Sequence, residues 1–227
     1  MIKLENAMKL IKTRIQLLDE TLGGGLPDKS VILMLGEPGS GNDILTQQIM
    51  YQHALKEGKV AYFTTFRPPE ITTEDFKTFG WDVSRLKADH WTFIDIHTSK
   101  ALQILQKEIS MRIGQGCWTV IDSLSYILLT QKHNLVLNMV ESLLDNARKH
   151  GGIHFLLLTQ GMHDPQTEIT MQHLADGVIE LIAQKTARGT SRRIRTKNMR
   201  KTVYVQKLIP FNITKNGIVV ETAVRIA

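Results

Sequence analysis

The sequence has a single cysteine, few aromatic residues and no long hydrophobic run. Cys117 alone cannot form an internal disulfide, and the absence of disulfides is typical of a reducing compartment, so we expect a cytoplasmic protein. No apolar stretch approaches the roughly 20 residues that a transmembrane helix needs. Charges are scattered through residues 1–14, a pattern unlike that of a signal peptide. We therefore expect neither a membrane span nor secretion.

Acidic residues are missing from one long part of the chain. No Asp or Glu lies between Glu180 and Glu221, and the whole chain has a net charge of +6. Such an excess of positive charge permits an anionic partner, including nucleic acid, but does not require one. The cations of this basic zone are Lys185, Arg188, Arg192, Arg193, Arg195, Lys197, Arg200, Lys201, Lys207 and Lys215.

Strand-like and helix-like segments alternate along most of the chain, which predicts an α/β fold. Hydrophobic residues make up 42% of the 227 positions, enough for one substantial core, so we treat residues 1–227 as one domain. The alternation predicts a mostly parallel central sheet flanked by helices, with antiparallel hairpins at its C-terminal edge. The expected parallel strands are 31–35, 60–66, 91–96, 117–123 and 153–160; the helices are 43–56, 72–80, 100–113 and 134–150; and the hairpin strands are 177–183, 192–199, 203–209 and 217–224.

The stretch GEPGSGND, residues 36–43, has the glycine spacing of a phosphate-binding loop between a buried strand and a helix. Its backbone N–H groups could cradle an anion. Where the motif needs Lys and then Ser or Thr, however, the chain has Asn42 and Asp43. The loop therefore indicates either an altered nucleotide site or a glycine-rich turn without a ligand. Its residues are Gly36, Glu37, Pro38, Gly39, Ser40, Gly41, Asn42 and Asp43.

The two substitutions act against a bound triphosphate. A carboxylate about 5 Å from one phosphate charge costs roughly 3 kcal/mol at an effective dielectric of about 20. Loss of the lysine hydrogen bond costs about 1.5–3 kcal/mol more. Asp43 can also cap the N–H groups of its own helix and so fill part of the anion site. We therefore expect weak or absent binding of ATP and Mg²⁺.

Several motifs in the right order resemble those of KaiC-like members of the RecA superfamily, and together they cover nearly the whole chain. The segment before the loop carries a glycine-rich turn, Gly23 to Gly25, followed by Pro27. WTVIDSLS resembles the second nucleotide motif of the family, with Asp122 at the end of a strand. LADGVIEL and RRIRTKNMR resemble later family elements. The resemblance implies a RecA-type ATPase core that assembles as a ring or filament, often a hexamer, with ATP between neighbours.

Asn42 and Asp43 are the first departure from the family pattern, and Phe66 and Arg67 are the second. After the second strand the family places Glu residues that activate the attacking water, whereas this chain has Phe66 and Arg67, and neither side chain can act as a carboxylate base. Glu70 follows and could be a displaced base, but we favour its interpretation as a solvated residue at the start of a helix. We therefore assign no catalytic residue.

The third departure lies in the element that, in the family, reaches across a subunit interface. The Lys–Met–Arg of the family corresponds to Asn198–Met199–Arg200, so the Arg remains and the Lys does not. Lys197 is one place away, and strand alternation predicts that it points to the opposite face. Lys197, Asn198 and Arg200 are the inter-subunit candidates that the resemblance implies.

The remaining candidate sites have ordinary structural explanations. Gly151 and Gly152 separate His150 from His154 and break any helix, so no metal pair is expected there. Cys117 begins a buried strand and is expected to pack in the core. His163–Asp164 is interpreted as a polar loop pair.

Strand alternation places three cations of the basic zone, Arg193, Arg195 and Lys197, on one face. They favour, in this order, a subunit interface, a solvated edge that resists aggregation, or contact with nucleic acid. The sequence as a whole predicts a non-hydrolysing regulatory or scaffolding subunit that assembles with itself or with an active KaiC-like paralogue. The alternatives are a slow ATPase and a nucleic-acid-binding paralogue.

Overall fold

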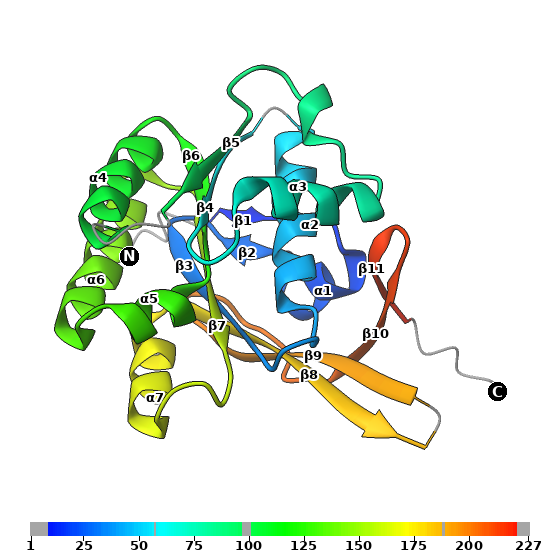
Figure 1. The fold of residues 1–227 in the computed structure, drawn as a ribbon. Coiled ribbons are helices and arrows are strands. Elements are labelled where there is room, and N and C mark those ends of the chain that lie inside the picture. Colours follow the sequence, from blue (N-terminus) through cyan, green and yellow to red (C-terminus); the bar gives the residue numbers. More distant parts are fainter. Residues whose placement is uncertain (1–8, 57, 97–100, 188, 222–227) are drawn as a thin grey trace, which may run out of the picture.

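A nine-stranded sheet forms the centre of the molecule in the computed structural model, which describes residues 9–56, 58–96, 101–187 and 189–221 (Figure 1). The strand order is β11-β10-β9-β8-β3-β7-β6-β4-β5. Neighbours from β8 to β5 are parallel, and β9, β10 and β11 extend the β8 edge as antiparallel strands. The strands are β3 (Ser30–Gly36), β4 (Lys59–Thr64), β5 (Trp91–Asp95), β6 (Cys117–Asp122), β7 (Ile153–Thr159), β8 (Gly177–Thr186), β9 (Gly189–Met199), β10 (Ile209–Thr214) and β11 (Gly217–Val220).

Helices cover both faces of the sheet, which gives a three-layer α/β/α arrangement (Figure 1). The helices α1, α2 and α3 lie on one face, and the helices α4, α5, α6 and α7 lie on the other. A short separate sheet pairs β1 (Leu10–Ile11) with β2 (Leu26–Pro27). The helices are α1 (Gln16–Thr21), α2 (Asn42–Ala54), α3 (Pro69–Thr78), α4 (Ala101–Gly114), α5 (Leu124–Thr130), α6 (His133–His150) and α7 (Pro165–Leu174), with a 3₁₀ turn at Val83–Arg85.

The core is divided by the sheet into two clusters, and β3 contributes to both. Every residue of β3 is buried, because helices cover the strand on each side and both sets of alternating side chains find apolar partners. Ile32 and Met34 pack toward α2, whereas Leu33 and Leu35 pack toward α4 and α6. The glycine loop therefore begins at the carboxyl end of a strand that is packed on both faces.

The structure confirms the expected fold class and all five parallel strands, with boundaries that differ by one or two residues. Three of the predicted helices also match closely. The helix predicted at 72–80 instead begins at Pro69, because proline suits the first turn of a helix, where its missing N–H needs no partner. The predicted helix start at Lys100 and the end of the predicted strand 217–224 lie outside the described residues.

Three helices were not expected from the sequence: α1, α5 and α7. The start of α7 carries a recognisable local pattern, since the Asp164 carboxylate accepts a hydrogen bond from the Thr167 N–H at 2.9 Å and Pro165 occupies the first turn. The Ser123 hydroxyl caps α5 in the same way, accepting from the Tyr126 N–H at 3.2 Å. The expectation that helices end after β7 was therefore wrong.

The strand predicted at 203–209 is also wrong. Val203 and Val205 are 88% and 56% exposed, so their apolar alternation does not mark a face packed on the core. The Val205 N–H donates to the Thr21 carbonyl oxygen at 2.9 Å, at the end of α1, and pairs with no strand of the large sheet. The sheet strand β10 begins only at Ile209. Within the described part of the chain, no helix is long and apolar enough to cross a membrane.

Candidate functional site

The glycine loop, residues 36–43, joins the carboxyl end of β3 to the first turn of α2. Gly39 and Gly41 have φ angles of +79° and +92°, which favour glycine over any residue with a β-carbon. A β-carbon on Gly36 would collide with the Ser40 hydroxyl. The Ser40 N–H donates to the Glu37 carbonyl oxygen at 3.0 Å and closes the turn. The glycine spacing therefore has the local geometry that a phosphate-binding loop requires.

Asn42 and Asp43, at the end of the glycine loop, each make a hydrogen bond within the chain. The Asn42 side-chain amide donates to the Met34 carbonyl oxygen, with a nitrogen-to-oxygen distance of 3.4 Å. The Asp43 carboxylate is exposed and accepts from the Ile44 N–H at 2.8 Å. Asp43 thus occupies one N–H group at the helix start, where an anion would otherwise find a donor.

A cavity of about 240 Å³ opens beside this loop. Its walls come from the loop, α2, α3 and the carboxyl ends of β4, β6 and β7, the edge where ligands bind in parallel α/β sheets. Three carboxylates line it, from Asp43, Asp75 and Asp122, and Arg67 is the one cationic side chain among the lining residues. The Arg67 Nη1 atom lies 3.6 Å from the Asp75 Oδ2 atom. We call this site the acidic cavity.

Asp122 lies at the end of β6 and is held by a buried tyrosine. The Tyr62 hydroxyl donates to Asp122 Oδ2 at 2.6 Å, and the Gln47 amide donates to the Tyr62 oxygen at 3.2 Å. Burial raises the pKa of Asp122 to about 6; the charge of Asp43 adds to this rise, and the Tyr62 hydrogen bond opposes it. Burial also raises the pKa of Tyr62 well above its usual value, so its hydroxyl remains a donor.

Two buried hydroxyl groups near the loop lack a hydrogen-bond partner among the described residues. Ser40 is fully buried inside the loop, and Thr64, at the end of β4, is 2% exposed and lines the acidic cavity. Buried hydroxyls without a partner are uncommon in folded proteins, because leaving one unsatisfied costs about 1–3 kcal/mol. An unsatisfied polar group on a cavity wall is a candidate contact for a ligand.

Phe66 and Arg67 follow β4, and both line the acidic cavity. Phe66 is 57% exposed and packs on Tyr126, with ring centroids 5.2 Å apart. Glu70 is exposed in the first turn of α3 and does not line the acidic cavity. Sequence reasoning missed Asp75, which does line it. Thr72 and Asp75 lie three residues apart on α3, so they share the face of the helix that lines the cavity.

A family model described as the ATPase KaiC matches residues 11–225. The chain belongs to the KaiC family. It is 27% identical to a UPF0273 protein of Saccharolobus solfataricus, over 94% of this chain and 83% of that protein. It is 26% identical to a UPF0273 protein of Methanocaldococcus jannaschii, over 94% of this chain and 96% of that protein.

The crystal structure of a KaiC-like protein from Pyrococcus horikoshii OT3 has the same fold. Its TM-score is 0.80 and its sequence identity is 23%, and the match covers 95% of this chain and all of that one. The fold expected from the sequence, a KaiC-like RecA-superfamily core, is therefore correct.

The inter-subunit candidates of this KaiC-family chain make contacts within the chain. A register shift between Val178 and Ile179 leaves Lys197 as an extra residue in β9. The Lys197 Nζ atom lies 3.7 Å from a Glu180 carboxylate oxygen, while Asn198 is paired with Val178. Val178 and Glu180 share one face of β8, so Lys197 and Asn198 lie on the same face of the sheet. The prediction that Lys197 points to the opposite face was wrong, because a bulge interrupts the alternation.

Arg200, the third inter-subunit candidate, follows β9. Its Nη1 atom lies 3.8 Å from Asp176 Oδ1, and its Nη2 atom donates to the His173 carbonyl oxygen at 3.0 Å. The Asp176 Oδ2 atom accepts from the Val31 N–H at 3.1 Å. Arg200 is thus tied to the turn between α7 and β8, near the start of β3, and not to the acidic cavity.

The other residues singled out from the sequence have structural roles. His154 is fully buried, with its ring nitrogens 3.0 Å from the Thr119 hydroxyl and 3.1 Å from the Gly151 carbonyl oxygen, and burial lowers its pKa to about 4. Cys117 packs in the core, and burial raises the pKa of its thiol. Asp164 caps α7. Among the described residues, no group of three or more His, Cys, Asp and Glu side chains could hold a metal ion.

Proposed function

We propose that this chain is a non-hydrolysing member of the KaiC family, a regulatory or scaffolding subunit that assembles with copies of itself or with an active relative. The observation that carries the proposal is the charge of the acidic cavity. Three carboxylates and one guanidinium line the place where a triphosphate would lie. The shape of the glycine loop is kept, but its electrostatics are reversed.

The donor set of the cavity fits ATP and Mg²⁺ poorly. Asn42 turns its amide toward the Met34 carbonyl oxygen, so no side chain of the loop offers a positive charge to phosphate. A carboxylate at the Asp43 position costs a nearby phosphate roughly 3 kcal/mol, and the missing lysine costs about 1.5–3 kcal/mol more. Together these terms weaken binding by about three to four powers of ten.

Hydrolysis also needs a base beside the phosphate. Phe66 cannot accept a proton, and Arg67 is paired with Asp75. One observation favours a slow ATPase as the second candidate, since Asp75 places a carboxylate on the wall of the same cavity. A phosphate-release assay separates the two functions: turnover that depends on Mg²⁺ and disappears in Asp75→Asn supports the ATPase.

Titration calorimetry with MgATP tests the main proposal. We expect no binding tighter than about millimolar for the natural chain, because the charge terms above remove several kcal/mol. The variant Asn42→Lys/Asp43→Thr should gain at least about 100-fold in affinity, since it restores the cation and the hydroxyl. Asn42→Gln/Asp43→Asn is the matched control, which removes the carboxylate without adding a cation, and should gain less. Micromolar binding of MgATP by the natural chain would overturn the proposal.

A further inference from the structure

Two of the three carboxylates in the acidic cavity have no cation beside them. Neither Asp43 nor Asp122 makes an ion pair with any residue in the described ranges of the chain, and each accepts a hydrogen bond from an uncharged donor. The guanidinium of Arg67 lies beside Asp75, with 3.6 Å between the closest nitrogen and oxygen atoms. Three carboxylates against one guanidinium leave the cavity with an excess of two negative charges when all are ionised.

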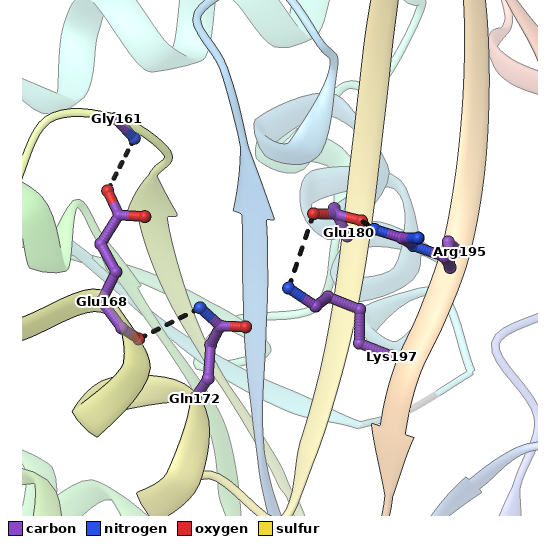
Figure 2. Close-up of polar contacts among 6 residues, drawn as sticks. All are labelled: Gly161, Glu168, Gln172, Glu180, Arg195 and Lys197. Carbon is purple, nitrogen blue, oxygen red and sulfur yellow. Dashed lines mark hydrogen bonds and ion pairs between the residues drawn. The ribbon is translucent and has the colours of Figure 1, made fainter. Parts of the chain in front are cut away.

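A buried carboxylate elsewhere in the chain, that of Glu180, has cations of its own. Arg195 contacts it through two nitrogens, Nε at 2.7 Å and Nη2, and the Lys197 Nζ atom lies 3.7 Å from its other oxygen (Figure 2). Asp122 has no such partner among the described residues, and burial raises its pKa to about 6. Because burial without a cation disfavours the ionised carboxylate, a cation that enters the cavity from solvent would be stabilised beside Asp122.

The size and the walls of the acidic cavity favour a small ligand with an apolar middle. Its volume of about 240 Å³ has room for about eight water molecules and lies below the roughly 300–1,000 Å³ of pockets that hold drug-sized ligands. Phe66 and Leu157 line it, and an aromatic ring attracts ammonium groups as well as apolar carbon. Thr64 also lines it, and its buried hydroxyl has no hydrogen-bond partner in the described part of the chain. This hydroxyl is a second, independent contact for a polar ligand.

The carboxylates of the cavity are spread over three elements. Asp43 lies in the first turn of α2, Asp75 lies in α3 and Asp122 ends β6. Among the described residues, no group of three or more His, Cys, Asp and Glu side chains is arranged to hold one metal ion. An extended dication, with a methylene chain between its charges, can reach carboxylates that a point charge cannot share. Each ammonium group also brings three N–H donors, which suit carboxylate and hydroxyl acceptors.

We propose that the acidic cavity binds a short aliphatic diamine of the polyamine class, such as putrescine, in its diammonium form. The ammonium groups donate to Asp43 and Asp122, and the Thr64 hydroxyl accepts a further hydrogen bond. The methylene chain lies against Phe66 and Leu157. The inference rests on the proposed function, because MgATP bound beside the glycine loop would occupy the same space.

Equilibrium dialysis with labelled putrescine tests the site. At about pH 7.5 and about 50 mM NaCl we expect a dissociation constant below about 1 mM, which rises at least about tenfold at about 500 mM NaCl because salt screens the charges. Asp43→Asn and Asp122→Asn should each weaken binding at least about tenfold, since each removes one charge from the cavity. Glu74→Gln is the matched control, an exposed acid of α3 outside the cavity, and should bind like the natural chain. Thermal melts check that the variants fold.

Matched ligands separate a diammonium site from simpler ones. Butylamine has a chain of the same length but one ammonium group, so it should bind at least about tenfold more weakly than putrescine. Mg²⁺ at equal ionic strength should not displace putrescine, because the carboxylates are not arranged around one ion. Binding of putrescine should also weaken at about pH 5, where Asp122, with its pKa of about 6, is largely protonated.

Several outcomes overturn the inference. Absence of putrescine binding at about 1 mM and low salt, unchanged binding by both aspartate variants, equal affinity for butylamine, or displacement by Mg²⁺ would each do so. Failure of the proposed function is measured separately by the calorimetry with MgATP. If MgATP binds at micromolar concentration, the proposed function fails and the diamine site fails with it. If neither MgATP nor putrescine binds, the proposed function stands and only the diamine site fails.

Discussion

Replacing Asp122 by asparagine should stabilise the protein above about pH 6, although aspartate is the residue that ends the second nucleotide motif. Burial raises the pKa of this carboxyl from 3.8 to about 6, and the charge of Asp43 adds to the rise. The folded state therefore disfavours the ionised form. The change Asp122→Asn removes the charge and keeps an oxygen that can accept a hydrogen bond from the Tyr62 hydroxyl.

The sign and size follow from proton linkage. Between pH 3.8 and about 6 the folded state binds more protons at Asp122 than the unfolded state does, so the free energy of unfolding falls as the pH rises through this window. The full gap corresponds to about 3 kcal/mol above pH 6. The residue is partly open to the cavity, where water screens the charge, so we expect about 1–3 kcal/mol. The advantage of Asp122→Asn should shrink toward pH 4.

Urea unfolding followed by circular dichroism measures this difference. We expect the midpoint of Asp122→Asn to exceed that of the natural chain at about pH 8, and the two midpoints to approach each other at about pH 5. Glu70→Gln is the matched control, an exposed acid outside the acidic cavity, and its midpoint should follow the natural chain at both pH values. Equal stability of Asp122→Asn and the natural chain at pH 8, or a difference that does not vary with pH, would refute the reasoning.

Two further changes test other parts of the fold by urea or thermal unfolding. Glu180→Gln should lower the free energy of unfolding by about 1–3 kcal/mol, because Arg195 and Lys197 then lose their shared carboxylate; an unchanged midpoint would contradict the role of this ion cluster. Gly25→Ala should cost about 1–3 kcal/mol, because its φ angle is +143° and a β-carbon would collide with the Ile11 carbonyl oxygen; a neutral effect would show that the β1–β2 pair is not needed.

Much of the fold could be predicted from local sequence patterns. Buried strands such as β3 appear as short apolar runs, and α6 shows helical spacing that ends at Gly151, so the order of the five parallel strands and of the helices predicted between them was correct. The helix α7 was missed although Asp164 and Pro165 mark its start. The apolar residues after β9 favoured a strand, but Val205 bonds to α1 instead.

The candidate site could be predicted only in part. Residues 36–43 form a continuous loop, so its glycine spacing and the residues Asn42 and Asp43 at its end can be read along the chain. Asp75 reaches the same cavity from α3 and the buried Tyr62 holds Asp122 from β4, and no pattern around residues 36–43 points to either of them. The bulge at Lys197 is likewise invisible in β9 alone, because it depends on how β9 pairs with β8.

The sequence by itself determined the order of the five parallel strands, the family resemblance and the presence of Asn42 and Asp43 at the end of the glycine loop. These properties are written in consecutive residues, through periodicity and glycine spacing. Only the tertiary structure decided which charges share the acidic cavity and which face of the sheet carries Lys197. The cavity forms where strands distant in sequence end together, and the face of Lys197 depends on the register between β8 and β9.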